Sequence, residues 1–193
     1  MATVELTPHN SVHPETLEQW RAWLAEHHDR GEGVWVVQWK RHTGRPAPGY
    51  DEMVCEALCW GWIDSTAGTV DADRNRIWLA PRRPGSGWSR PNKERLTRVL
   101  AQGRMQPAGQ RVLDRAHQDG SWTLLDDVED LVVPEDLAAA LADRPGARDH
   151  WDSFSPSSRK MALTWLVQAR RPATRARRVQ QVAAAAERGE KAR

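Results

Sequence analysis

Residues 82–105 (RRPGSGWSRPNKERLTRVLAQGRM) combine the residue types that bind anions. A Pro-Gly-Ser turn precedes a predicted helix start, where free backbone N–H groups and the positive end of the helix dipole attract negative charge. Seven basic side chains lie between Arg82 and Arg104, against one acid, Glu94. Trp88, predicted to be exposed, adds a flat aromatic face for a base or a guanidinium. The segment therefore predicts a site for a phosphate, a carboxylate or single-stranded nucleic acid.

The candidate ligand-binding residues are the charged and short polar side chains of this segment together with its tryptophan: Arg82, Arg83, Ser86, Trp88, Ser89, Arg90, Asn92, Lys93 and Arg95. A purely structural interpretation stands beside this one. In it, the segment is a capped helix whose arginines pair with residues 114–152, a stretch of eleven carboxylates and three arginines. Both interpretations fit a chain whose net charge is only +2.

A second cluster could support the first. Glu56 and Trp60 share a face of a predicted helix, and Trp62 and Asp64 lie on the short predicted strand that follows Gly61. If that strand lies beside Arg82 or Arg83, a carboxylate–arginine pair would brace the turn. The sharper hypothesis makes Glu56 or Asp64 a general base in a pocket lined by tryptophan.

The chain lacks the motifs of the common catalytic and metal sites. GSGWS does not have the Lys-Ser/Thr ending of a phosphate-binding P-loop, and no serine lies in a G-x-S-x-G elbow. The histidines do not follow metal-ligand spacing, and Cys55 and Cys59 lack the further ligands of a zinc site, so buried small hydrophobes are expected there. We therefore predict no catalytic residue, no metal and no cofactor.

The bulk properties predict a globular chain of 193 residues, 39% hydrophobic and 28% charged, long enough to bury a core. The start of the sequence lacks a basic stretch followed by an apolar run, and no segment approaches the roughly 20 apolar residues of a membrane span. These features predict a cytoplasmic protein without a membrane span.

Periodicity and capping signals predict an α+β fold, with a small mixed β-sheet and helices in the N-terminal half and a helical C-terminal half packed on it. Strands are expected at 33–42, 62–64 and 76–81, with a turn at 65–75. Asp51, Pro107, Ser155 and Pro172 mark the starts of helices. Further helices are expected at 15–30, 90–102, 134–142 and 147–151.

The predicted organisation is a polar N-terminal lead at 1–14, an α+β region with the basic turn and helix at 15–105, a helical region at 106–187 packed on it as one compact unit, and a frayed tail at 188–193. Beyond the short alanine run 183–186, no internal repeat or low-complexity segment interrupts this order.

Several strings in this order resemble the YdeI/OmpD-associated (bacteriocin-protection) protein family. They are EALCWGWIDS at 56–65, APRRPGSGWSRPNKER at 80–95, GRMQPAG at 103–109, DGSW at 119–122, VPEDL at 133–137 and ARRPATRARR at 169–178. The resemblance runs from about residue 20 to residue 182. It implies a link to stress and to bacteriocin or cationic-peptide resistance, or to a porin, without an established reaction.

We therefore expect a non-enzymatic binding protein whose basic, Trp-bearing surface takes an anionic ligand, either a phosphate-bearing molecule or nucleic acid. One alternative is an enzyme that holds a phosphorylated or carboxylated small molecule, with Glu56 or Asp64 working beside Arg82 or Arg83. Another is an adaptor that binds a protein partner through surface tryptophans.

Overall fold

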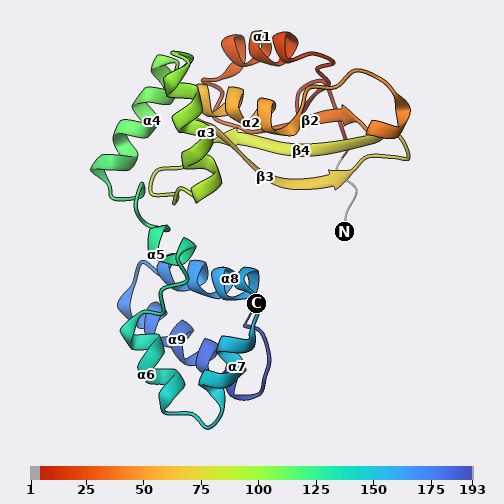
Figure 1. The fold of residues 1–193 in the computed structure, drawn as a ribbon. Helices are drawn as coiled ribbons and strands as arrows, with labels where there is room; N and C mark the ends of the chain where they lie inside the picture. Colours follow the sequence, from red (N-terminus) through yellow and green to blue (C-terminus); the bar gives the residue numbers. More distant parts are fainter. Residues whose placement is uncertain (1–4, 193) are drawn as a thin grey trace. The chain divides into compact units, whose positions relative to one another are not determined.

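The computed structural model describes residues 5–192. They form two compact units: unit 1 contains the residues up to 86 together with 91–121, and unit 2 contains 87–90 together with 122 onward. The chain thus enters unit 2 for four residues, returns to unit 1, and crosses again after residue 121. Unit 1 holds a four-stranded mixed sheet and both units hold helices (Figure 1), which confirms the predicted α+β class.

The sheet has the strand order β1-β2-β4-β3. Strand β1 (Ser11–Val12) runs parallel to β2 (Val34–Trp39), whereas β4 (Arg74–Pro81) is antiparallel to β2 and to β3 (Trp62–Thr69). The β-branched and aromatic residues of β2 suit a pleated strand between two neighbours. Helices α1 (Leu17–His27) and α2 (Tyr50–Cys59) lie on one face of the sheet (Figure 1).

The core of unit 1 lies between that face and the two helices. Trp20 and Leu24 of α1 meet Val34 and Val36 of β2, and the remaining buried members are Met53, Ala57, Trp62 and Leu79. The Trp20 indole N–H donates a hydrogen bond of 3.1 Å to the Met53 carbonyl, so its one polar group is satisfied. Each large side chain buried in this way contributes about 1.5–3 kcal/mol.

The start of α2 differs from the prediction. The helix begins after Gly49, whose backbone N–H donates to the Glu52 carboxylate at 3.2 Å. The predicted helix cap at Asp51 is wrong, because Asp51 already lies in the first helical turn. Its carboxylate is free to pair with arginines of another helix.

Strand β3 is longer than predicted. The expected strand 62–64 continues to Thr69, and the polar residues 65–69, interpreted as a turn, pair with β4 after an irregularity between Asp64 and Ala67. Pairing with a long partner strand outweighs the turn preference of these small residues.

Helix α3 (Arg90–Ala101) ends before Gly103, which adopts φ +64°, and α4 (Pro107–Gln118) begins at the predicted proline. A glycine allows α4 to approach α2 closely, because a Cβ atom on Gly109 would lie 2.2 Å from the Cys59 carbonyl oxygen. Gly61, at φ +78°, turns the chain from α2 into β3 beside Val112 of α4. These two contacts fix α4 against the end of α2.

Unit 2 consists of α5 (Asp126–Glu129), α6 (Glu135–Ala142), α7 (Ala147–Ser153), α8 (Pro156–Val167) and α9 (Pro172–Glu187). Helix α9 packs against α6, α7 and α8 through Val179, Val182, Ala183 and Ala186. The predicted cap of α8 is confirmed, since the Ser155 hydroxyl accepts from the Ser158 N–H. The short helix α5 was not predicted.

On α8, the Met161 side chain is 48% exposed, whereas its neighbours Ala162 and Leu163 are buried in the core of unit 2. Within residues 5–192, no helix is both long enough and apolar enough to cross a bilayer.

The close approach at Gly109 yields a stability prediction. In an exposed helix, replacing glycine by alanine raises the free energy of unfolding by up to about 1 kcal/mol. Gly109→Ala should instead lower it by about 1–2 kcal/mol, because the added methyl group meets a backbone carbonyl that cannot move away. Chemical denaturation measures the change. Gly31→Ala is the matched control, because nothing lies within 4 Å of its Cβ position. Equal effects of the two substitutions would contradict the close packing.

Candidate anion-binding pocket

The basic segment 82–105 does not form one continuous site. Trp88 is only 2% exposed and belongs to unit 2, where its ring lies 5.4 Å from that of Trp122. The expectation of an exposed Trp88 face is wrong. Trp88 is buried because the chain packs closely against unit 2 at the preceding residue: a Cβ atom on Gly87 would lie 2.6 Å from Leu125. Trp88 is therefore a core residue of unit 2.

Other candidate residues are bound to their own neighbours. The Ser86 hydroxyl donates to the Arg83 carbonyl at 2.7 Å, and the Asn92 side-chain oxygen accepts from Arg95 at 2.9 Å. Arg83 is exposed, while Ser89 and Lys93 are half-buried. These contacts stabilise the turn and the helix start, and they do not bring the candidates together around one cavity.

The helix α3 arginines pair with acids at two places. In unit 2, the Arg90 guanidinium donates to Asp130 at 2.5 Å, which agrees with the predicted matching to the acidic stretch 114–152. In unit 1, Arg95 and Arg98 instead donate to Asp51 of α2, at 2.8 and 2.5 Å. These two guanidinium groups hold the pKa of the Asp51 carboxyl below its usual value, with the hydrogen bond from Arg95 the largest cause. Charge matching inside each unit thus accounts for these three arginines.

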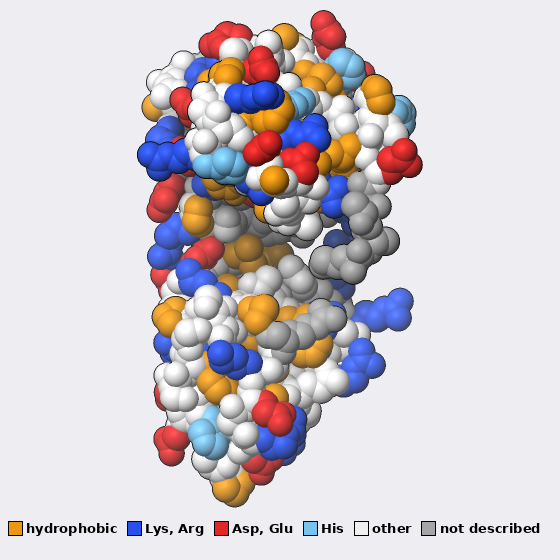
Figure 2. Space-filling view, turned by 90° about the vertical axis from the view of Figure 1, so that its right-hand side faces the viewer, with side chains coloured by type: hydrophobic (Ala, Val, Ile, Leu, Met, Phe, Trp, Pro, Cys, Tyr) orange, Lys and Arg blue, Asp and Glu red, His pale blue; other side chains and the backbone are white. Residues whose placement is uncertain are grey.

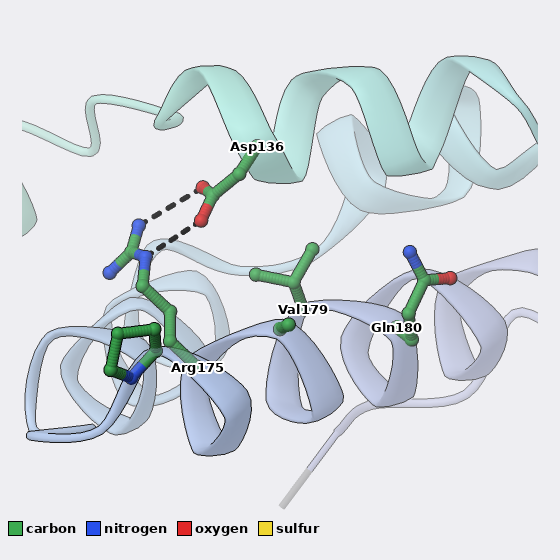
Figure 3. Close-up of a pocket in the computed structure, with 6 residues that line it drawn as sticks. Asp136, Arg175, Val179 and Gln180 are labelled. Atoms are coloured by element: carbon green, nitrogen blue, oxygen red, sulfur yellow. Dashed lines mark hydrogen bonds and ion pairs between the residues drawn. The ribbon is translucent and has the colours of Figure 1, made fainter.

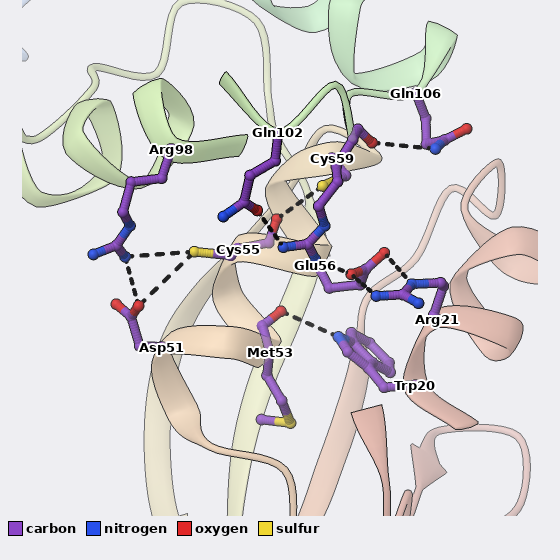
Figure 4. Close-up of polar contacts among 11 residues, drawn as sticks. Trp20, Arg21, Asp51, Met53, Cys55, Glu56, Cys59, Arg98, Gln102 and Gln106 are labelled. Carbon is purple, nitrogen blue, oxygen red and sulfur yellow. Dashed lines mark hydrogen bonds and ion pairs between the residues drawn. The ribbon is translucent and has the colours of Figure 1, made fainter. Parts of the chain in front are cut away.

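Glu56 lies at the centre of a buried ionic contact (Figure 4). Its side chain is 4% exposed and accepts two hydrogen bonds of 3.1 Å from Arg21 of α1 and another from Arg104. The predicted partners of this carboxylate, Arg82 and Arg83, are not the ones it contacts. A buried carboxylate is tolerated only when it is paired and fully hydrogen-bonded, so this contact is structural.

The two cysteines lie beside this ionic contact in Figure 4. The Cys59 thiol donates to the Cys55 carbonyl at 3.2 Å, and both cysteines are free and buried, as predicted. Burial raises the pKa of the Cys59 thiol to about 11, which keeps it protonated at neutral pH.

Asp64 is bound by Tyr50, whose hydroxyl donates to the Asp64 carboxylate at 2.6 Å. Burial, followed by this hydrogen bond, raises the pKa of the Tyr50 hydroxyl to about 12. Asp64 also acts on Arg82: burial lowers the pKa of the Arg82 guanidinium to about 10, and the Asp64 charge opposes that shift. The predicted proximity of Asp64 and Arg82 is therefore present as an electrostatic interaction.

The feature that gathers positive charge is a pocket of about 200 Å³ within unit 1. It lies where the ends of α1, α2 and β4 meet the start of β3 and one face of α4. The lining residues are His28, Asp29, Trp60, Gly61, Trp62, Pro81, Arg82, Ala108, Arg111, Val112 and Arg115. Three of them are arginines and one, Asp29, is an acid.

The polar groups of this pocket suit an anion. Arg82 is 8% exposed, so its charge acts in a medium that screens it weakly. Arg111 and Arg115 are exposed on successive turns of α4, and no ion pair joins either of them to another residue in the described part of the chain. The Trp60 indole N–H is buried and has no acceptor among residues 5–192, although the Trp62 indole donates to the His28 carbonyl at 2.8 Å.

The sequence predicts Trp60, Trp62 and Arg82 as candidate residues, but it does not single out the two arginines that α4 adds to the lining. Arg111 and Arg115 are four residues apart on a helix that the sequence predicts from Pro107, so the sequence also predicts that they share one face of that helix. That they line the same pocket as Arg82 could not be predicted, because it depends on the close approach of α4 to the end of α2 at Gly109.

Two other pockets carry balanced charge. In unit 2, Asp136 and Arg175 form two hydrogen bonds of 2.6 and 3.0 Å across the end of a pocket of about 280 Å³, with Val179 behind them (Figure 3). A pocket of about 580 Å³ in unit 1 has Arg30, with Glu32 and His9 paired at 4.0 Å in its lining. Figure 2 likewise shows basic and acidic side chains interspersed on the surface it presents. The pocket at Arg82 differs by its excess of cations.

Comparisons with known proteins divide the chain into two parts. The model of a family described as a domain of unknown function (DUF8412) matches residues 12–112, just over half of the 193 residues, and the chain belongs to that family. A second model, described as bacteriocin-protection, YdeI or OmpD-associated, matches residues 130–189 and confirms the predicted resemblance there. No curated protein and no solved structure matches significantly.

The resembling strings fall on both sides of this division. The strings at 133–137 and 169–178 lie inside the YdeI/OmpD-associated match, whereas those at 56–65, 80–95 and 103–109 lie inside the other family's range. The string at 119–122 lies in neither. The pocket, with lining residues from His28 to Arg115, lies almost entirely in the range of the family whose function is unknown.

The Tyr50–Asp64 hydrogen bond predicts an unusual titration. Tyr50 is the only tyrosine of the chain, so absorbance at 295 nm reports its ionisation alone. The Tyr50 hydroxyl should ionise near pH 12, about two units above an ordinary tyrosine. Asp64→Asn should lower the pKa of Tyr50, because it removes the carboxylate that favours the protonated hydroxyl. Because the folded-state pKa is raised, this group's stabilisation is present below about pH 10 and is lost as the pH rises toward 12. Tryptophan fluorescence checks that the protein stays folded. Ionisation near pH 10 in the folded protein would contradict the contact.

The Glu56 contact predicts a large loss of stability. Glu56→Ala leaves Arg21 and Arg104 facing each other without their common carboxylate, and should lower the free energy of unfolding by about 3 kcal/mol. Urea denaturation measures the change. Glu26→Ala, an exposed position on α1, is the control and should change stability by less than about 0.5 kcal/mol. A loss as small as that for Glu56→Ala would show that the buried pairing contributes little.

Proposed function

We propose that the protein is a non-enzymatic binding protein whose pocket between Arg82 and α4 holds a small anionic group, a phosphate or a carboxylate. The observation that carries the proposal is the convergence of Arg82, Arg111 and Arg115 on one cavity whose lining includes a single carboxylate. Guanidinium groups bind such anions through paired, charge-assisted hydrogen bonds. The ligand can be a free anion or the charged end of a larger molecule.

The size of the pocket supports a small group. Sites for drug-sized ligands measure roughly 300–1,000 Å³, and this pocket, of about 200 Å³, falls below that range. It suits a phosphoryl or carboxylate group better than a complete nucleotide. Trp60 and Trp62 form an apolar wall beside the cations, which lowers the local dielectric constant and strengthens each charge interaction.

The enzymatic alternative has less support. Glu56 and Asp64, the two carboxylates suggested as general bases, already accept hydrogen bonds from Arg21 and Tyr50, respectively. Neither carboxylate is in the lining of the pocket. We therefore propose binding without a chemical step.

The proposed biological context rests on the family description. The match of residues 130–189 carries the words bacteriocin-protection, and we include a role in bacteriocin resistance in the proposal on that ground alone. Anion binding by the pocket is a separate property that can be measured on the purified protein.

Calorimetric titration with inorganic phosphate, sulfate and acetate at low ionic strength tests the pocket. Saturable binding of at least one of these anions is expected. Arg111→Gln and Arg115→Gln should each weaken it about tenfold, the value of one charge-assisted hydrogen bond, because both side chains are exposed and removable without loss of the fold.

The matched control is Arg177→Gln, which changes an exposed helical arginine of unit 2. It should leave the affinity unchanged. Absence of saturable binding for all three anions, or an equal loss with the control variant, would refute the proposed pocket.

A further inference from the structure

The face of the sheet opposite α1 and α2 has an unusual composition. Along β2, Val34 and Val36 point into the core, so the alternate residues Trp35, Val37 and Trp39 point to the other face. The register of β2 with β4 adds three residues to that face, because Trp78 pairs with Trp35, Arg76 with Val37 and Arg74 with Trp39. We call this the Trp–Arg face and define it by Trp35, Trp39, Arg45, Arg74, Arg76 and Trp78.

Arginines stack on the tryptophans of this face. The Arg76 guanidinium lies 4.4 Å from the centre of the Trp35 ring, and that of Arg45 lies 4.2 Å from the centre of the Trp39 ring. Arg74 approaches the Trp39 ring at 5.8 Å, and the Trp35 and Trp78 rings meet edge to face at 5.2 Å. Planar cations and indoles therefore alternate along the strands for roughly 13 Å, the rise of four residue steps from Trp35 to Trp39.

The tryptophans of this face are partly exposed, unlike those of the core. Trp20 and Trp62 are fully buried in the core of unit 1, whereas Trp35, Trp39 and Trp78 each keep a part of their surface in water. Burying these three rings completely would be favourable by itself. Their exposure on a sheet face that no described helix of unit 1 covers marks a surface for a partner.

The charge of the face indicates the partner. Arg45 lies on the exposed segment after β2, and no ion pair joins it to another residue in the described part of the chain. Two acids lie nearby: Asp71 binds Arg74 with hydrogen bonds of 2.8 and 2.5 Å, and Glu15 accepts from the Trp39 indole at 3.4 Å. The three arginines Arg45, Arg74 and Arg76 outnumber these two acids, so the face keeps an excess of positive charge, which favours a polyanion.

We propose that the Trp–Arg face binds single-stranded nucleic acid. Unstacked bases stack on indole rings and on guanidinium planes, and the phosphates between them pair with the arginines. A duplex offers phosphates but keeps its bases stacked internally, and a sulfated polysaccharide offers charge without flat aromatic faces. A single strand uses both properties of this face.

This inference does not depend on the anion pocket. The two surfaces share no residue, since the pocket is lined by other side chains, which lie just after α1 and α2, at the start of β3, at the end of β4 and on α4. Substitutions on one surface therefore distinguish the two proposals.

Fluorescence anisotropy of labelled single strands of about 12 nucleotides, DNA and RNA, tests the proposal on the chain of 193 residues. Binding at low salt should be accompanied by quenching of the intrinsic tryptophan fluorescence. Arg45→Gln should weaken binding about fivefold and reduce the dependence of log affinity on log salt by about 0.7, the contribution of one phosphate contact. Trp39→Leu, which keeps an apolar side chain but removes the stacking surface, should weaken binding about tenfold.

Arg148→Gln is the control, because Arg148 is exposed on α7 in unit 2 and should not affect the affinity. Thermal unfolding of each variant separates loss of binding from loss of the fold, and Arg45, on an exposed loop, keeps the test valid if Trp39→Leu is unstable. Three results would each overturn the proposal: no binding of any strand at low salt, equally tight binding of heparin or duplex DNA, or unchanged binding by a folded Arg45→Gln variant.

Discussion

Burial of the Glu56 carboxylate is the constraint on which the arrangement of unit 1 depends. A buried charge costs several kcal/mol unless ion pairs and hydrogen bonds replace its water, and Glu56 obtains these from Arg21 of α1 and from Arg104 after α3. A second acid of α2, Asp51, holds two arginines of α3. Helix α2 is thus an acidic centre around which three basic segments are fixed. The segment that contains Arg104 leads directly into α4, so the same pairing sets the position of the pocket.

The predictions that succeeded rest on local signals. Pro107, Ser155 and Pro172 start helices because a fixed φ or a capping hydroxyl acts within a single turn, whatever the rest of the chain does. The failures involve distant partners. Residues 65–69 became strand because β4 pairs with them, and Trp88 became buried because residues more than thirty positions later in the sequence surround it. No pattern within a short window contains that information.

The prediction of the candidate site divides in the same way. The residue types were correct, since arginine and tryptophan line the pocket, and Arg82, Trp60 and Trp62 were among the named candidates. Which residues come together could not be predicted. The arginines of the basic segment 82–105 form ion pairs within two different units, and the pocket is completed by Arg111 and Arg115 of α4. In this chain arginine has three distinct uses: it neutralises buried acids, it stacks on indoles, and it lines a cavity. The partner that each guanidinium meets decides among them, and most of these partners are distant in sequence.

Residues 87–90 have a consequence for the modular character of the chain. They lie inside the stretch matched by the first family but belong structurally to unit 2, where Trp88 packs near Trp122 and Gly87 meets Leu125. The second family's match begins only at residue 130. A gene fusion or truncation that separates the two matched stretches would therefore remove a tryptophan from the core of the unit it intends to preserve. The boundary between the two matched stretches is therefore not a boundary between the two folded units.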